Sequence, residues 1–248
     1  VSRSASPSTF RCHLPISAMS FLRWFLLALL AGCAAPGDRG VESAPSPVEA
    51  DSYFEAARRG APVYEVVPEQ SLLLIHVGRD GAARRLGHDH AVASEQLSGF
   101  VALGTQPGEW RADIAFPVRN LTVDKPEYRE RLGLDTQPTE ADIAGTYGNM
   151  LRVLEPDLYP WVSVRLRLAA IGDEGPELAA SVTLHGSTAE YLVPVTLETG
   201  PSTLTARGRV VIRHSDFGLE PFSAMGGLLR VADELPLEFY IVARRLPG

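Results

Sequence analysis

Residues 161–168 read WVSVRLRL, and this stretch decides the fold class. From Val162 to Leu168 every second side chain is aliphatic, and the side chains between them are one serine and two arginines. Because successive side chains of a β-strand point to opposite faces, this period of two places all the aliphatic groups on one face. The stretch therefore predicts a strand with one face in an apolar core and the other in water.

The same alternation recurs on both sides of this stretch. It is clear in residues 110–116 (WRADIAF) and in residues 234–245 (ELPLEFYIVARR). Further strands are predicted at residues 72–77, 96–103, 178–185, 190–198 and 203–213. Glycine- and proline-containing turn signals separate several of them, as at residues 172–175 and 199–202. About eight strands with few helices between them predict an all-β, antiparallel sheet closed into an eight-stranded barrel.

One inserted helix interrupts the strand pattern. Residues 139–142 (TEAD) form a capping-box sequence, and apolar residues follow at helical spacing up to Leu154. A second, short helix is predicted at residues 52–59. Residues 118–138 are rich in charged residues and proline, and they predict a long loop at one end of the barrel.

The amino-terminal part predicts export and lipidation. From Met19 the chain has Arg23, an apolar run at residues 24–30 and the sequence Leu-Ala-Gly-Cys at residues 30–33. This order is typical of a bacterial lipoprotein signal peptide, cleaved before a cysteine that then receives a lipid anchor. We therefore expect three parts. They are an upstream extension and signal peptide (1–32), a disordered tether with the short helix (33–62), and the barrel domain (63–248).

Composition excludes several classes of function. The chain of 248 residues has a formal net charge of −7, which argues against a nucleic-acid partner. Both cysteines, Cys12 and Cys33, precede the predicted domain, so the domain has no thiol for a disulfide, a thiolate metal site or a cysteine nucleophile. No nucleotide-binding or hydrolase motif is present, and no cofactor is expected.

Residues 87–90 (Gly-His-Asp-His) are the sharpest local feature. If they are extended, His88 and His90 project from the same face and can bind one metal ion. The third ligand would have to be His76, His185, His214 or a distant acid. Two other interpretations remain open at this point: a hydrogen-bonded turn, and a polar contact with the head group of a ligand.

The barrel interior is the second candidate site, because an eight-stranded barrel either fills with side chains or leaves room for one elongated ligand. The residues expected to line it are Leu74, His76, Phe100, Trp110, Ile114, Phe116, Val164, Leu166, Tyr191, Val193, Ile212, Phe239 and Ile241. The same residues would equally form a packed core, in a barrel that acts as an interaction module for envelope partners.

Several stretches together resemble the YceI-like family of periplasmic, lipocalin-like barrels. They are YEVVPEQSLLLIHVGRDG (64–81), SGFVAL (98–103), VLEPDLYPWVSVR (153–165), LHGSTAEYLVPVTL (184–197), RHSDFGLEP (213–221) and VADELPLEFYIVARR (231–245). The resemblance covers roughly residues 64–245. At residues 86–90 the chain has Leu-Gly-His-Asp-His in place of the family's commoner Gly-x-Phe segment, so the family's ligand contacts are not carried over there.

The resemblance implies a hydrophobic tunnel that binds a polyisoprenoid or another long-chain amphiphile without catalysis. It also favours the periplasmic side of the outer membrane, where Cys33 would hold the protein to the bilayer. The alternative function is a metal-binding protein or metal-dependent enzyme that uses His88 and His90.

Overall fold

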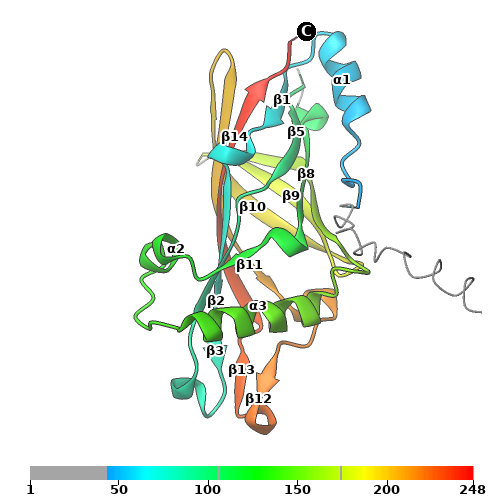
Figure 1. The fold of residues 1–248 in the computed structure, drawn as a ribbon. Helices are drawn as coiled ribbons and strands as arrows, with labels where there is room; N and C mark the ends of the chain where they lie inside the picture. The colour runs from blue at the N-terminus through cyan, green and yellow to red at the C-terminus, as the bar shows by residue number, and fades with distance from the viewer. Residues whose placement is uncertain (1–43, 105–106, 174, 248) are drawn as a thin grey trace, which may run out of the picture. The chain divides into compact units, whose positions relative to one another are not determined.

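A computed structural model describes residues 44–104, 107–173 and 175–247 (Figure 1). Cys33 and the predicted signal peptide lie outside these residues. In spatial order the barrel strands are β1 (Val63–Val66), β5 (Ser98–Ala102), β6 (Arg111–Pro117), β8 (Trp161–Gly172), β9 (Gly175–Leu184), β10 (Ser187–Thr199), β11 (Thr203–Arg213) and β14 (Glu234–Arg245). The ring closes because β1 pairs with both β5 and β14. The prediction of an all-β, eight-stranded antiparallel barrel is confirmed.

The main sheet continues past β14. Its further strands are, in order, β2 (Leu72–Val77), β4 (His90–Ser94) and β7 (Thr122–Val123). β1 and β2 pair with successive parts of β14, and the 3-10 helix Pro68–Gln70 separates them. The expected strand at residues 72–77 therefore has the right bounds, but β1 takes its place in the ring. With only four residues, β1 is too short to show an alternation in the sequence.

The inserted helix is α3 (Glu140–Leu154), and it crosses one end of the barrel (Figure 1). Its capping box is formed: the Asp142 main-chain N–H donates to Thr139 Oγ1 at 3.2 Å, and the Thr139 N–H donates to Asp142 Oδ2 at 2.9 Å. The apolar face of α3 packs against the main buried cluster through Met150, Leu151 and Leu154. The helix prediction is confirmed.

Two further helices cover the outer face of the sheet, α1 over the barrel and α2 over the strands that continue past β14. α1 (Ala50–Arg58) buries Tyr53 completely, and the Tyr53 hydroxyl donates to Asp113 at 2.7 Å. The chain already contacts the barrel at Ala44, whose carbonyl accepts a hydrogen bond from Trp161 Nε1 at 3.0 Å. The short helix predicted at residues 52–59 is thus present as α1, whereas the predicted disorder of the tether is not seen at residues 44–49, where Ala44 contacts the barrel. For residues 33–43 it stays a prediction that falls outside the described residues.

α2 (Pro126–Arg131) covers β4 and the buried residues Leu74, Ala91 and Ala93. The prediction of a long loop over residues 118–138 is thus wrong, because this segment also supplies β7 and a 3-10 helix at Val118–Asn120. None of the helices within the described ranges has the length and apolar character needed to cross a bilayer.

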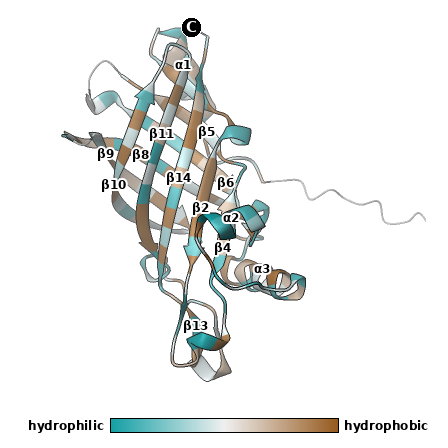
Figure 2. Cartoon of the chain, turned by 90° about the vertical axis from the view of Figure 1, so that its left-hand side faces the viewer, coloured by the Kyte–Doolittle hydropathy of each residue, from teal (hydrophilic) through white to brown (hydrophobic). Residues whose placement is uncertain are grey.

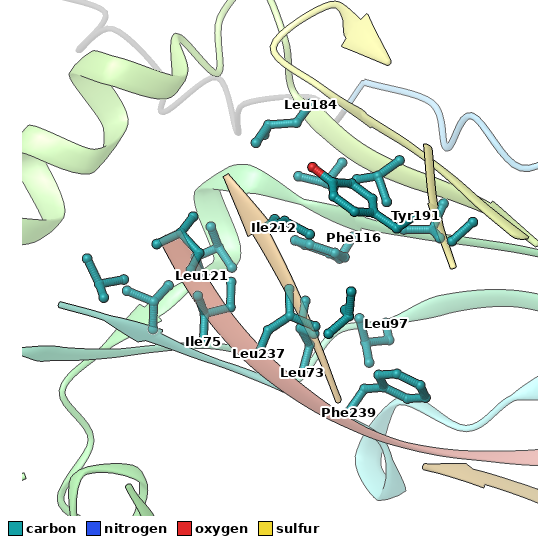
Figure 3. Close-up of a pocket in the computed structure, with 18 of the residues that line it drawn as sticks. Leu73, Ile75, Leu97, Phe116, Leu121, Leu184, Tyr191, Ile212, Leu237 and Phe239 are labelled. Atoms are coloured by element: carbon teal, nitrogen blue, oxygen red, sulfur yellow. The ribbon is translucent and has the colours of Figure 1, made fainter. Parts of the chain in front are cut away.

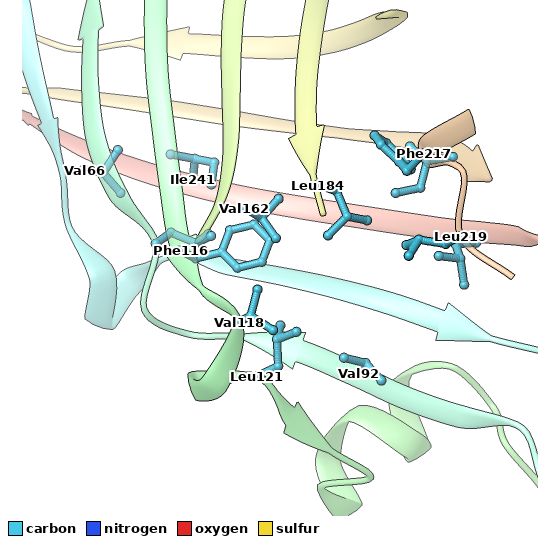
Figure 4. Close-up of a cluster of buried hydrophobic side chains, with 13 residues drawn as sticks. Val66, Val92, Phe116, Val118, Leu121, Val162, Leu184, Phe217, Leu219 and Ile241 are labelled. Carbon is cyan, nitrogen blue, oxygen red and sulfur yellow. The ribbon is translucent and has the colours of Figure 1, made fainter. Parts of the chain in front are cut away.

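The largest buried cluster joins barrel strands to the segments beside them (Figure 4). Its members are Val66, Val92, Leu97, Phe116, Val118, Leu121, Val162, Leu184, Ile212, Phe217, Leu219, Leu235 and Ile241. Val118 and Leu121 come from the segment between β6 and β7, and Phe217 and Leu219 follow β11. These contacts hold the segments after β6 and after β11 against the barrel strands.

A small second sheet projects past α3 and away from the barrel (Figures 1 and 2). Its strands are β12 (Ser223–Ala224), β13 (Leu229–Val231) and β3 (Arg79–Asp80), with β13 in the centre. We call residues 79–87 and 222–231 the tip. Its turns use glycines at positive φ, such as Gly81, where a Cβ would lie only 2.4 Å from the Leu228 carbonyl oxygen.

Candidate functional site

A cavity of about 670 Å³ runs through the interior of the barrel. Strands of the ring, β2, α3 and the tip all contribute to its lining. Figure 3 shows aliphatic and aromatic side chains pointing toward one another across this space, among them Leu73, Phe116 and Phe239. The volume is typical of sites for organic ligands, which span roughly 300–1,000 Å³. The barrel is therefore hollow rather than fully packed.

Most of the residues predicted for the interior line this cavity. They are Trp110, Ile114, Phe116, Val164, Leu166, Tyr191, Val193, Ile212, Phe239 and Ile241. Those that lie in strands share the inner face because alternate side chains of a strand point to the same side of the sheet. Their role in binding a ligand stays a prediction.

Three of the predicted interior residues do not line the cavity: Leu74, His76 and Phe100. Leu74 is buried in the cluster beneath α2. The Phe100 ring stacks on the Tyr53 ring of α1, with centroids 5.3 Å apart. Both strands are covered by helices on their outer face, so apolar side chains occur on both faces and the alternation that identifies the inner face is lost.

Two groups of lining residues were not predicted: those that take the inward places of β2, and those that lie outside the strands. Leu73, Ile75 and Val77 of β2 face the cavity instead of Leu74 and His76. α3 contributes its inner face, including Met150 and Val153. The helical spacing of apolar residues was a signal that α3 covers an apolar surface, but not that this surface is a cavity.

The polar lining residues gather mainly where residues 86–90, α3 and the tip meet, which we call the histidine end. They are Arg79, His88, His90, Asp142, Thr146, Asn149, His214 and Arg230. Away from this end, Arg111 of β6 and Arg167 of β8 also line the cavity, and they lie opposite each other on the two neighbouring strands. The structure thus brings His88 and His90 to the same cavity as the barrel residues, although only His90 lies in a strand.

His90 is held by a buried carboxylate. Its Nδ1 lies 2.6 Å from Asp124 Oδ2, and the Asp124 side chain is fully buried. The other oxygen of Asp124 accepts hydrogen bonds from the Ala91 N–H at 2.9 Å and from Arg129 Nη1 at 2.6 Å. Burial works against ionisation of this carboxyl group, but these hydrogen bonds prevail and lower the pKa of Asp124 below its ordinary value.

This arrangement decides which nitrogen of His90 is available to a ligand. Because the Asp124 carboxylate can only accept, His90 donates from Nδ1. Its Nε2 is the remaining polar atom, 3.4 Å from Thr146 Oγ1 on α3. The His88 ring is tilted 68° to the His90 ring, with centroids 6.3 Å apart, and its Nδ1 is buried without a hydrogen-bond partner among the described residues.

The charged residues of the histidine end are already engaged by neighbours. Arg79 donates to the Gly87 carbonyl at 2.5 Å and pairs with Asp89 at 3.4 Å. Arg230 pairs with Asp80 at 2.7 Å. Asp142 is used by the cap of α3. The groups left to face a ligand are therefore imidazole nitrogens and small polar groups rather than unpaired charges.

Among the residues that the structure describes, no third ligand joins His88 and His90 at the predicted metal site. Within the described ranges no three His, Cys, Asp or Glu side chains are grouped closely enough to hold a metal ion. His76 points away from the cavity, where it faces Asp89 at 3.6 Å. His185 is bonded to Glu155 at 2.7 Å, and His214 Nδ1 lies 3.3 Å from the Asp233 main-chain carbonyl.

No family model and no curated protein matches the chain. Solved structures do. BcnA from Burkholderia cenocepacia superposes with a TM-score of 0.51 at 16% sequence identity, covering 71% of this chain and 98% of that chain. A polyisoprenoid binding domain from Saccharophagus degradans, implicated in plant cell wall breakdown, has a TM-score of 0.51 at 15% identity, covering 74% and 98%.

A YCEI protein from Campylobacter jejuni is also similar, with a TM-score of 0.41 at 13% identity over 60% of this chain and 80% of that chain. At these identities the likeness concerns the fold. This chain therefore has the barrel fold of BcnA and of the Saccharophagus domain, which is the fold that the resemblance to the YceI-like family implied.

Proposed function

We propose that this protein binds a long-chain lipid of the isoprenoid type inside its barrel and performs no chemical step on it. The observation that carries the proposal is the apolar cavity of about 670 Å³. Each methylene group that leaves water contributes roughly 0.8 kcal/mol, so the affinity should rise with tail length until the cavity is full. The similar Saccharophagus domain is a polyisoprenoid binding domain, which agrees with this ligand class.

The ligand lies with its tail among the aliphatic residues and its head at the histidine end. His90 Nε2 can accept a hydrogen bond from a hydroxyl group, and Asp124 keeps it in that tautomer. Arg79 and Arg230 are occupied by Asp89 and Asp80. A neutral head with a hydroxyl group therefore suits this end better than a phosphate, which would need unpaired guanidinium groups.

The protein acts, in this proposal, as a lipoprotein on the periplasmic side of the cell envelope, with the outer membrane favoured. The sequence at residues 30–33 supports lipidation of Cys33. Two or three acyl chains on one cysteine anchor a protein stably, whereas a single chain does not. A Cys33→Ser variant should move from the membrane fraction to the soluble periplasmic fraction, and intact-mass measurement of the unaltered protein should show the acyl groups.

Organic extraction of the purified full chain, followed by mass spectrometry, tests the binding proposal. We expect a long-chain lipid in the extract of the unaltered protein. Ala206→Trp on β11 fills the cavity from within and should abolish recovery. Val211→Trp on the same strand is the matched control, because Val211 is 47% exposed and does not line the cavity.

Two results would contradict the proposal. One is an unaltered protein that yields no lipid and takes up no added quinone or polyprenol. The other is an Ala206→Trp protein that folds, as judged by its thermal unfolding, and retains the same lipid as the Val211→Trp control. Either result would favour a role of the barrel surface over a role of its interior.

A further inference from the structure

The tip exposes large apolar side chains that no other part of the described chain covers. Leu86 is 69% exposed, Met225 56%, Leu228 52% and Phe222 36%. Hydrogen bonds gather these residues at one place: the Ala83 N–H donates to the Leu228 carbonyl at 2.8 Å, and the segment of Phe222 is bonded to β13. Exposed apolar side chains clustered in this way are typical of surfaces that bind a membrane or a partner protein.

This apolar surface continues into the cavity. Leu86 and Phe222 each belong to the exposed set and also line the cavity. Leu229 on β13 also lines the cavity, and a Cβ at Gly87, next to Leu86, would lie 2.9 Å from its Cδ1. A ligand tail that leaves the cavity past these residues would thus stay in contact with apolar side chains up to the outer surface of the tip.

The charge of the tip differs from that of the whole chain. The tip holds four arginines and one acid, whereas the full chain has a net charge of −7. The one acid, Asp80, is paired with Arg230. Arg84 and Arg85 are exposed beside Leu86, and within the described residues neither forms an ion pair. Arginines next to exposed aliphatic residues are complementary to a bilayer surface with anionic lipid head groups.

The tip has regular secondary structure, held by hydrogen bonds between its strands. β13 pairs with β12 on one side and with β3 on the other. The Val231 N–H also donates to the Phe222 carbonyl at 2.9 Å, and the Ala232 N–H donates to the Gly78 carbonyl at 2.8 Å. The exposed side chains are therefore presented on a hydrogen-bonded support, which lets them enter another phase together.

We propose that the tip docks on the surface of a lipid bilayer that contains anionic phospholipid. Leu86, Met225 and Leu228 enter the acyl region, and Arg84 and Arg85 contact the head groups. The cavity then opens toward the membrane, so a lipid can pass between bilayer and barrel without crossing water. This inference rests on the proposed function, for which it supplies the route of the ligand.

A fluorophore on the tip tests the docking directly. In a full chain with Cys12→Ser and Cys33→Ser, one NBD label is placed at Leu228→Cys or, as the control, at Leu192→Cys. Leu192 is 61% exposed and lies on β10 in the barrel wall. We expect a blue shift and a rise in NBD emission at position 228, and not at 192, on addition of phosphatidylcholine vesicles that contain phosphatidylglycerol. Vesicles of phosphatidylcholine alone should give a smaller change.

Three outcomes would overturn the proposal. The first is no change at position 228 with either kind of vesicle. The second is an equal change at positions 228 and 192, which would mean that other parts of the chain bind the membrane. The third is a blue shift at 228 that depends on protein concentration without vesicles, because the tip would then bind a second copy of the chain.

A transfer experiment separates this inference from the proposed function. The double variant Met225→Ser, Leu228→Ser should extract a fluorescent farnesol analogue from anionic vesicles about tenfold more slowly, since the loss of two inserted apolar side chains that do not line the cavity weakens membrane binding. Its uptake of the same probe from detergent micelles should be unchanged. The control variant Leu192→Ser should behave as the unaltered protein in both assays.

The two failures are distinguishable. If the unaltered protein takes up no probe from micelles, the proposed function fails, while the NBD measurement still decides whether the tip binds a bilayer. If uptake from micelles is normal and the double variant extracts the probe from vesicles at the unaltered rate, the docking inference fails alone.

Discussion

His90 Nδ1 lies 2.6 Å from Asp124 Oδ2, although 34 residues separate the two in the chain. Asp124 in turn accepts a hydrogen bond from Arg129, whose side chain is 8% exposed. One buried carboxylate thus links α2, which carries Arg129, to the first residue of β4. This connection positions the imidazole that faces the cavity.

Asp124→Asn should destabilise the protein strongly. The substitution removes the negative charge and leaves the buried Arg129 guanidinium without its counter-charge, which typically costs about 3–5 kcal/mol. Urea unfolding of both proteins measures the difference. Asp157→Asn is the control, since Asp157 also pairs with an arginine but is 88% exposed and should change stability by less than about 1 kcal/mol. Equal effects of the two substitutions would refute the structural role of Asp124.

His90→Phe should reduce the affinity for a lipid with a hydroxyl head. We expect a loss of about fivefold for a polyprenol, because one hydrogen bond contributes roughly 1 kcal/mol, and little change for a hydrocarbon of equal length. His185→Phe is the control, because His185 lies outside the cavity. Fluorescence competition measures both affinities, and an equal loss for polyprenol and hydrocarbon would contradict the assignment of the head group to this end.

The free energy of unfolding should fall as the pH drops below about 6.5. Burial lowers the pKa of His214 in the folded state, although the nearby Asp233 opposes this shift. The unfolded chain therefore binds a proton at a pH where the folded chain does not, and stability is lost as the pH falls through this window. His214→Gln should flatten this part of the profile.

Carboxylates contribute to the acid side of the same profile at lower pH. Hydrogen bonds from Ser215 lower the pKa of Asp233, so the stability it supplies is present above its ordinary pKa and is lost only at more acidic pH. Urea midpoints measured across the range separate the two contributions. A profile that is identical in the unaltered and His214→Gln proteins between pH 5 and 7, about the range where histidine titrates, would disprove the assignment.

Tyr53→Ala should cost about 3–5 kcal/mol of stability, because Tyr53 is completely buried between α1 and β5. The hydroxyl donates to Asp113, and burial together with this bond raises the pKa of Tyr53. Phe54→Ala on the same helix is the control and should cost less, since Phe54 is 38% exposed. Chemical unfolding checks the difference, and equal losses would contradict the assignment of Tyr53 as the residue that anchors α1.

Strict alternation made the inner face predictable for some strands. In β8 aliphatic residues alternate with serine and arginine, so Val164 and Leu166 were placed correctly in the interior. In β2 the residues 72–75 are all leucine or isoleucine, so nothing in the sequence distinguishes Leu73 from Leu74. The helix α2, which covers the outer face there, decides which of them faces the cavity.

By itself the sequence determined the all-β class, the positions of most barrel strands, the capped helix at Thr139 and the candidate histidines. These features depend on residues close together in the chain, and a local period or motif records them. The tertiary structure alone decided that the barrel is hollow, that Asp124 holds His90 and that the tip carries exposed leucines beside arginines. Each of these depends on contacts between distant segments, and a local pattern carries no information about the distance between them.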